Sequence, residues 1–144
     1  MSGFYLQEGL PRPQPNALDA PYWAGLLREE LALQRCHDCG KFQWGPEWIC
    51  HRCLSGELGY ETVEPSGVVY SYERVWHPVH PALAGQGPYL VVLVELPHAD
   101  GVRLVGNLLG DPLQDVRIGA KVTAAFERHG NAEPPFALLH WIAM

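Results

Sequence analysis

The sequence predicts a mainly β protein that carries a small metal-binding module near its N-terminal end. Three observations support this prediction: four cysteines fall in two Cys-x-x-Cys pairs, five strand-like runs follow them, and only one short segment has helical spacing. The 13 prolines and 15 glycines among 144 residues favour turns and short strands over long helices. A chain of this length fits one domain, or a small domain with an attached metal module.

The N-terminal part of the chain predicts an extended arm followed by one short amphipathic helix. Residues 11–15 include three prolines and indicate a polyproline-like arm that lies on this protein or on a partner. Asp19 is expected to be the N-cap, with Pro21 in the first helical turn. Residues at helical spacing follow: Tyr22, Trp23, Leu26, Leu27 and Glu30. The alternation within residues 31–34 then predicts an extended segment that leads into the first cysteine pair.

The two cysteine pairs predict a metal site with four thiolate ligands. Cys36 and Cys39 form the first pair, Cys50 and Cys53 form the second, ten residues separate the pairs, and the chain has no other cysteine. This arrangement matches a closed tetrahedral zinc site, which stabilises a module too small to have a core of its own. We expect the metal to be structural, because no coordination position is left for a reacting water.

Two disulfides and a rubredoxin-type iron site are the alternative uses of the same four cysteines. Residues 1–5 contain no basic stretch followed by an apolar one, so nothing in them indicates export to an oxidising compartment. Iron accepts the same ligands and is not excluded, but no residues indicate an electron-transfer role. We therefore expect zinc, with His37 and His51 as exposed residues inside the cysteine pairs.

The charge of the chain argues against nucleic acid as a partner. The formal charge is −6, and four thiolates with one divalent metal would make it about −8. Binding to a phosphate backbone normally needs clustered cations. The one grouping of cations is Arg35, Lys41 and Arg52, which we expect to offset the thiolates. Because no apolar run approaches the roughly 20 residues that span a bilayer, we also expect no membrane partner and a cytoplasmic location.

Three aromatic side chains lie between the cysteine pairs, namely Phe42, Trp44 and Trp48. A hairpin of this size cannot bury three such side chains by itself. We therefore expect some of them to cover the helix or the surface of a partner.

The region from residue 61 onward predicts a five-stranded barrel of the OB type. Strand-like runs cover residues 68–76, 89–96, 102–109, 121–128 and 136–142, and Asp100-Gly101 forms a turn between the second and third runs. The longer break at residues 111–115 favours a Greek-key barrel over a two-sheet sandwich. The chain thus divides into an N-terminal arm and helix (1–33), a rubredoxin-like zinc ribbon (34–60) and an OB-fold barrel (61–144).

Several motifs resemble, in the same order, a family of small zinc-ribbon and OB-fold proteins long catalogued as a domain of unknown function. They include residues 33–40, 50–53, 66–72, 94–96 and 106–108. The resemblance covers nearly the whole chain, although residues 54–58 and 79–87 follow no pattern that identifies a substrate. It implies a non-catalytic partner of a thiolase, a thiolase-like acyltransferase or a steroid side-chain aldolase. Such a partner supports the catalytic subunit and helps to form the acyl-CoA binding region.

The sequence also lacks the common motifs of independent catalysis. It has no Gly-x-Ser-x-Gly elbow, no His-Glu-x-x-His helix and no phosphate-binding Gly-rich loop, and every cysteine is assigned to the metal. We therefore predict no catalytic residue and a hetero-oligomer with a thiolase-like catalytic subunit, in the simplest case two copies of each. Arg35, Arg52 and Arg74 are the candidates for binding the phosphates of CoA.

Two other functions stay open from the sequence. A module for single-stranded nucleic acid would use Trp44, Trp48, Tyr70 and Tyr72 as stacking platforms, against the negative charge. An acyl-CoA hydrolase or aldolase acting alone would use His77 and His80, which lie between prolines on the loop that joins the first two barrel strands. This histidine pair could also hold a second metal, but we expect both to be exposed loop residues.

Overall fold

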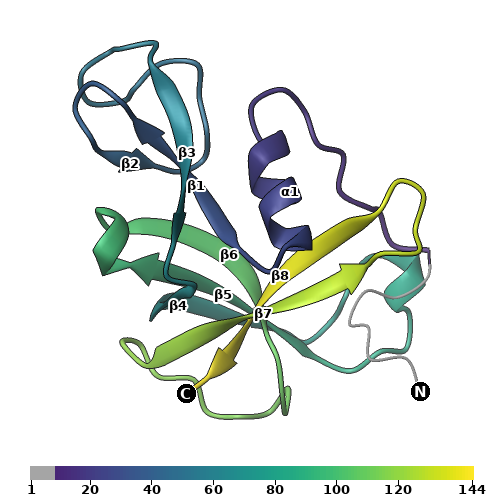
Figure 1. Ribbon diagram of the computed structural model, residues 1–144. Coiled ribbons are helices and arrows are strands. Elements are labelled where there is room, and N and C mark those ends of the chain that lie inside the picture. Colours follow the sequence, from purple (N-terminus) through teal and green to yellow (C-terminus); the bar gives the residue numbers. More distant parts are fainter. Residues whose placement is uncertain (1–8) are drawn as a thin grey trace.

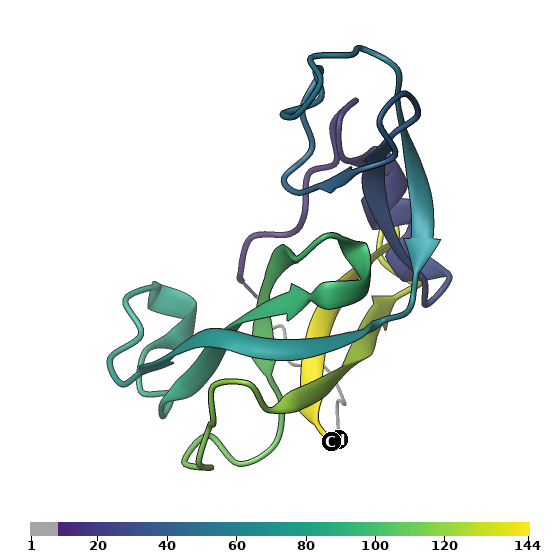
Figure 2. The same ribbon diagram turned by 90° about the vertical axis from the view of Figure 1, so that its left-hand side faces the viewer.

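The computed structural model describes residues 9–144 and contains one α-helix, a three-stranded sheet and a closed barrel (Figure 1). The first eight residues, which belong to the predicted N-terminal arm, lie outside the described residues. The small sheet projects from one end of the barrel, and the helix lies where the two meet (Figures 1 and 2). The elements in chain order are α1 (Ala20–Leu27), β1 (Leu31–Cys36), β2 (Phe42–Gln43), β3 (Leu58–Val63), β4 (Ser66–Val75), the 3-10 helix η1 (Pro81–Leu83), β5 (Tyr89–Leu96), the 3-10 helix η2 (Pro97–Ala99), β6 (Val102–Leu108), β7 (Lys121–His129) and β8 (Phe136–Ala143).

Helix α1 begins at the predicted N-cap, but the side chain of Asp19 does not cap it. The Asp19 carboxylate instead accepts the backbone N–H of Asn16 at 2.7 Å, which closes a tight turn before the helix. The helix ends in a Schellman arrangement, because Glu29 has a φ of 59° and the N–H of Glu30 reaches back to the carbonyl of Gly25. Glu30 therefore lies beyond the helix, and its predicted place on the helical face is wrong.

The small sheet has the order β2-β1-β3, with antiparallel pairing on both sides of β1. The predicted extended segment is β1, and residues 31–34 are all buried, so both of its faces are covered. Strand β3 was not predicted, because its sequence includes Gly59 and shows no clear apolar alternation. Its pairing with β1 along six residue positions compensates for this weak local signal. Strand β3 also crosses the predicted domain boundary between residues 60 and 61. The boundary itself stays a prediction.

The barrel contains the five predicted strands, each displaced by no more than two residues at either end. Its closed order is β4-β5-β6-β8-β7. All strand pairs are antiparallel except β6 with β8, which pair in parallel through Asn107 with His140 and Leu108 with Trp141. The alternation of buried and half-buried residues along β5 is the periodicity that the sequence predicted. This Greek-key closure confirms the predicted OB fold.

The hydrophobic core fills the barrel and extends under α1. Trp141 on β8 is completely buried, as are Val92 and Val94, and Leu90 is only 1% exposed. The helix contributes Leu26 to the same core. In the described residues no helix is long and apolar enough to cross a bilayer.

Candidate metal centre

The four cysteines meet at the end of the small sheet that lies away from the barrel. We call the small sheet with its cysteine loops the ribbon. Cys36 ends β1, and the other three lie in the loops that follow β1 and β2. The Sγ atoms of Cys36 and Cys53 are 3.6 Å apart, as are those of Cys39 and Cys50, and all four lie within 4.8 Å of one another. A tetrahedral site with Zn–S bonds of about 2.3 Å has sulfur–sulfur edges of about 3.8 Å. The four thiols are therefore positioned to bind a metal ion, and they fit the geometry of zinc.

Backbone N–H groups of both cysteine pairs point at ligand sulfurs. The N–H of Cys39 lies 3.5 Å from Cys36 Sγ, and the N–H of Arg52 lies 3.4 Å from Cys50 Sγ. The N–H groups of Cys53 and Arg52 lower the pKa of Cys50 to about 6, and the N–H of Cys39 lowers the pKa of Cys36. Burial and hydrogen bonds to the neighbouring thiols raise the pKa values of Cys39 and Cys53. Because a metal binds the thiolate and not the thiol, the N–H contacts of Cys36 and Cys50 favour metal binding.

Two buried glutamines hold the loop between the cysteine pairs. Gln34 donates to the carbonyl of Glu47 at 2.9 Å and accepts the N–H of the same residue at 3.0 Å. Gln43 donates to Gln34 Oε1 at 2.7 Å and accepts the N–H of His51 at 2.8 Å. This role of the two glutamines was not predicted from the sequence. The signal in the sequence was weak, because a polar residue such as Gln34 among the apolar residues of β1 is also expected from ordinary strand alternation.

A turn of the barrel is tied to the edge of the ribbon through Asp100. Its carboxylate accepts the N–H of Phe42 at 2.9 Å and lies 3.5 Å from Lys41 Nζ. The Phe42 N–H, together with the charge of Lys41, lowers the pKa of Asp100. Asp100 can reach the ribbon because the predicted Asp100-Gly101 turn has positive φ at both residues, 56° and 72°.

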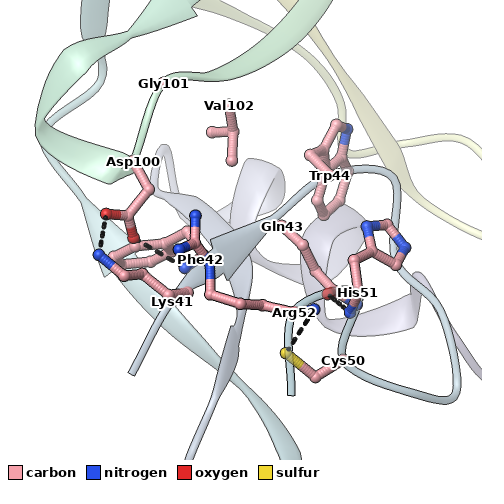
Figure 3. Close-up of a pocket in the computed structure, with 10 residues that line it drawn as sticks. All are labelled: Lys41, Phe42, Gln43, Trp44, Cys50, His51, Arg52, Asp100, Gly101 and Val102. Atoms are coloured by element: carbon pink, nitrogen blue, oxygen red, sulfur yellow. Dashed lines mark hydrogen bonds and ion pairs between the residues drawn. The ribbon is translucent and has the colours of Figure 1, made fainter. Parts of the chain in front are cut away.

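An open cleft of about 450 Å³ lies between this turn and the ribbon (Figure 3). The ribbon lines one side, and residues 100–102 of the barrel line the other. The Arg52 side chain extends across the cleft past Phe42, whereas the His51 ring lies on the side of Trp44 (Figure 3). The cleft therefore gathers cationic and aromatic side chains next to the metal centre.

The three arginines predicted to bind CoA lie in different surroundings. Arg35 donates to the Gly40 carbonyl at 2.7 Å and pairs with Glu61 at 2.7 Å. Arg74 donates to the backbone carbonyls of Pro112 and Gln114. Arg52 lines the cleft, and its guanidinium forms no ion pair with another described residue. The structure does not bring the three together, and their contact with CoA stays a prediction.

The histidines and aromatics of the two alternative functions are also dispersed. His77 is exposed, and His80 Nδ1 accepts the N–H of Ala82 at 3.1 Å, so His80 caps η1. Among residues 9–144 the four cysteines are the one group of metal-binding side chains close enough to share an ion. Trp44 packs on Tyr22 of α1 with ring centroids 4.8 Å apart, which confirms that a ribbon aromatic covers the helix.

The remaining stacking candidates do not form one platform. Trp48 is 67% exposed on the ribbon, whereas Tyr70 and Tyr72 lie on β4 of the barrel. Tyr70 is covered by Arg103, whose Cζ is 3.6 Å from the ring centroid. The four predicted stacking residues are therefore divided between the two parts of the molecule.

A buried polar cluster on the barrel was not predicted. Glu127 on β7 accepts hydrogen bonds from His129 Nε2 at 2.6 Å and from His140 Nε2 at 3.2 Å. Burial lowers the pKa of His140, while its hydrogen bond to Glu127 opposes this shift. Glu127 and His129 alternate along one strand, a weak signal, but the contribution of His140 depends on the pairing of β7 with β8.

Two family models match adjoining parts of the chain. Residues 23–59 match the rubredoxin-like zinc ribbon domain of ChsH2, and residues 60–127 match the C-terminal OB-fold domain of ChsH2. The solved structure of an Ltp2-ChsH2(DUF35) aldolase contains a chain that superposes with a TM-score of 0.77 at 32% identity, covering 92% of this chain and 98% of that one.

Two curated relatives are also similar to this chain. A "Probable enoyl-CoA hydratase alpha subunit" from Thermomonospora curvata is 39% identical to this chain. The aligned region covers 78% of this chain and 34% of that protein. A "DUF35 domain-containing scaffold protein" from Methanocaldococcus jannaschii is 32% identical over 65% of this chain and 65% of its own length. The chain thus spans about a third of the first relative and less than two thirds of the second. By its two domains and its near-complete match to a chain of the Ltp2-ChsH2(DUF35) aldolase, the protein belongs to the ChsH2 (DUF35) family of zinc-ribbon and OB-fold proteins.

Proposed function

We propose that this protein is a non-catalytic, zinc-binding accessory subunit of a thiolase-superfamily enzyme. In this role it stabilises the catalytic subunit and helps to hold its acyl-CoA substrate. The observation that carries the proposal is the match to nearly the full length of the ChsH2(DUF35) chain of an Ltp2-ChsH2 aldolase. The resemblance of the sequence motifs to partners of thiolase-superfamily enzymes agrees with it.

The metal centre supports a structural and not a catalytic role. All four cysteines converge on one site, so a bound ion would have four protein ligands and no position for water. No cysteine then remains for acyl transfer. We infer that the ion is zinc, because residues 23–59 match a zinc ribbon domain and the four sulfurs, which lie within 4.8 Å of one another, suit a tetrahedral ion.

The names of the relatives support an association with CoA thioesters. One is named an enoyl-CoA hydratase subunit, one a scaffold protein, and the solved complex an aldolase. The first name includes a CoA ester, and hydratase and aldolase are different reactions. A chain that is common to such different enzymes is better explained as a supporting module than as the source of the chemistry.

The ribbon offers a surface for docking on the catalytic subunit. Trp48, Ile49 and Leu54 are exposed and line one shallow depression beside Cys50. The amides of Gln34 and Gln43 fix the loop that carries Trp48 and Ile49. An apolar surface on a rigid loop binds a partner with little loss of conformational entropy, so the ribbon is our candidate for the docking element.

Co-expression with the products of the neighbouring genes, among them any thiolase-like protein, tests this proposal. We expect a stable complex in size-exclusion chromatography, with one zinc per copy of this chain by elemental analysis. A double substitution Trp48→Ser, Leu54→Ser should release the partner while zinc content stays at one. The matched control is Val79→Ser, which alters an even more exposed apolar residue on the barrel loop.

Three results would contradict the proposal. The first is a zinc-loaded chain that does not bind its neighbour. The second is co-purification with a hydratase-type neighbour in place of a thiolase-like one, which would reject the thiolase part alone. The third is salt-sensitive retardation of single-stranded oligonucleotides by the isolated chain, which would favour the nucleic-acid module.

A further inference from the structure

We propose that the outer face of β7 and β8 is a binding site for an extended, proline-rich segment that carries an arginine, and that residues 9–15 of the same chain occupy it reversibly. We call residues 9–15 the strap. The inference does not depend on the accessory role, because it concerns a contact within this chain.

A buried aromatic side chain lies on the outer face of these two strands. Phe136 is only 6% exposed and is paired with His129 in the register of β7 and β8. Successive residues of a strand point to opposite faces of a sheet. Ala137, Leu139 and Trp141 belong to the hydrophobic core, whereas Phe136 does not. Phe136 therefore points out of the barrel, and its burial requires a cover from another part of the chain.

The strap provides such a cover. The Cζ atom of Arg12 lies over the Phe136 ring, 5.5 Å from its centroid. Gly9 lies beside Ala82 of η1, since a Cβ added at Gly9 would be 3.5 Å from the Ala82 Cβ. The strap thus reaches from the loop between β4 and β5 to the start of β8, next to the loop between β7 and β8 (Figure 1).

The position of the strap coincides with the usual ligand face of an OB barrel. In this fold the loops that follow the first and the fourth barrel strands border the face that binds extended polymers. Here these loops are residues 76–88 and residues 130–135. Ala82 belongs to the first loop, and Phe136 comes directly after the second. The strap therefore lies where a separate extended ligand would bind.

The face offers aromatic surface and negative charge to an arginine. The His129 ring stacks on Phe136, with centroids 4.5 Å apart and an interplanar angle of 10°. The Glu127 carboxylate accepts a hydrogen bond from His129 Nε2, so an acid lies next to the stacked rings. A guanidinium is attracted both to the face of an aromatic ring and to a nearby carboxylate. The site therefore suits a segment with an arginine better than an acidic one.

The composition of the strap suits reversible binding. Pro11, Pro13 and Pro15 favour an extended conformation before binding, so little conformational entropy is lost when the strap docks. Only Leu10 and Pro13 are half-buried, and the other strap residues are exposed. A segment with so little buried surface can leave the face while the barrel stays folded.

Competition by a free peptide tests the inference. A peptide with the sequence of residues 9–17 is titrated into the zinc-loaded, ¹⁵N-labelled full chain and into its Arg12→Gln variant, and the amide shifts of His129 and Ala137 are followed. Because a tethered strap competes at an effective concentration of roughly millimolar, we expect the variant to bind the peptide about fivefold or more tightly than the wild type. Arg117→Gln, at an exposed position of another barrel loop, is the matched control and should behave as the wild type.

A second peptide, which carries Arg12→Gln, tests the chemistry of the site. It should bind the Arg12→Gln chain at least about threefold more weakly than the first peptide, because it lacks the cation that lies over Phe136. Equal affinity for the two peptides would reject the role assigned to the arginine.

Three other results would overturn the inference. Absence of saturable shifts in the Arg12→Gln chain would show that the face is not a binding site. Equal affinity of the wild type and of Arg12→Gln for the first peptide would show that the strap does not occupy the face. Concentration-dependent dimerisation of the wild type, abolished by Arg12→Gln in analytical ultracentrifugation, would place the strap on a second copy of the chain.

Discussion

The ribbon and the barrel are stabilised in different ways. The buried residues of the ribbon between residues 34 and 60 are two cysteines and two glutamines, Cys36, Cys50, Gln34 and Gln43. The barrel core consists of leucine, valine and alanine side chains around Trp141. Amide hydrogen bonds and the four metal-binding thiols therefore hold the loops of the ribbon, whereas burial of apolar surface holds the barrel together with Leu31 and Leu33 of β1. The loops of the ribbon can therefore lose their structure while the barrel stays folded.

Helix α1 belongs to both parts. Leu26 enters the barrel core, while Tyr22 packs on Trp44 of the ribbon. The Tyr60 hydroxyl on β3 donates to the carbonyl of Leu18, just before the helix, at 2.5 Å. Burial at this joint raises the pKa of Tyr60 to about 12, with a smaller contribution from Asp19. The helix therefore connects the ribbon to the barrel through contacts with both.

Removal of the metal should have the largest effect and should separate the two parts. A structural zinc contributes about 10–16 kcal/mol of apparent binding energy at neutral pH, and the ribbon has no apolar core to replace it. With a chelator, or with Cys36→Ser, we expect the amides of β2 and the cysteine loops to lose protection in hydrogen-exchange mass spectrometry. The amides of β5 and β6 should keep theirs. Simultaneous loss of protection in the barrel would refute the comparison.

Gln43→Leu should weaken the ribbon without metal removal. The substitution leaves the N–H of His51 without its acceptor and the Ile49 carbonyl without its donor, at a cost of about 3 kcal/mol. Zinc affinity, measured by competition with a chromogenic chelator, should fall at least about tenfold. Gln86→Leu is the control, since Gln86 is exposed on the barrel hairpin. Unchanged zinc affinity would mean that the amide network does not position the ligands.

Gly106→Ala should weaken the barrel alone. A Cβ at Gly106 would lie 2.8 Å from Trp141 Cδ1 and 3.1 Å from the Leu139 carbonyl. Neither neighbour can move easily, so we expect a loss of about 2 kcal/mol in the free energy of unfolding, measured by urea denaturation. Gly87→Ala, where the added Cβ meets no atom within 4 Å, is the matched control. A change in zinc affinity would show that the two parts are coupled more tightly than their cores suggest.

Asp100→Asn should have the smallest effect and should loosen the joint. The side chains of Asp100 and Lys41 are 34% and 44% exposed, so the contacts of the carboxylate contribute less than about 1 kcal/mol. The folded-state pKa of Asp100 is lowered by the Phe42 N–H and then by Lys41. Its contribution is therefore complete above the unfolded-state value of about 3.9 and is lost as the pH falls through the lower folded value.

Unfolding of the wild type and of Asp100→Asn between pH 7 and pH 2 measures this contribution. The small difference in the free energy of unfolding between the wild type and the variant should disappear near pH 2. At pH 7, ¹⁵N relaxation should show more independent motion of the ribbon in the variant. Asp111→Asn is the control, because the Asp111 carboxylate lies in a barrel loop and contacts the N–H of Leu113 in the same loop. An equal pH dependence in both variants would show that Asp100 does not join ribbon and barrel.

The elements that the sequence predicted correctly are those whose signal is local. The cysteine spacing defines the metal site because each pair lies within four consecutive residues. The barrel strands were predicted because alternation along residues 89–96, for example, matches burial on one face. The N-cap of α1 was also found, although its side chain forms a turn with Asn16 in place of a cap.

What the sequence alone determined, then, is a four-thiolate ribbon followed by a five-stranded barrel. Only the tertiary structure decided that β3 pairs with β1, that Gln34 meets Gln43, and that Asp100 reaches across 58 positions to Phe42. It also decided which of the three arginines faces the cleft. These features depend on contacts between residues far apart in the chain. No periodicity or spacing encodes such contacts, because they exist only after the ribbon and the barrel have been placed against each other.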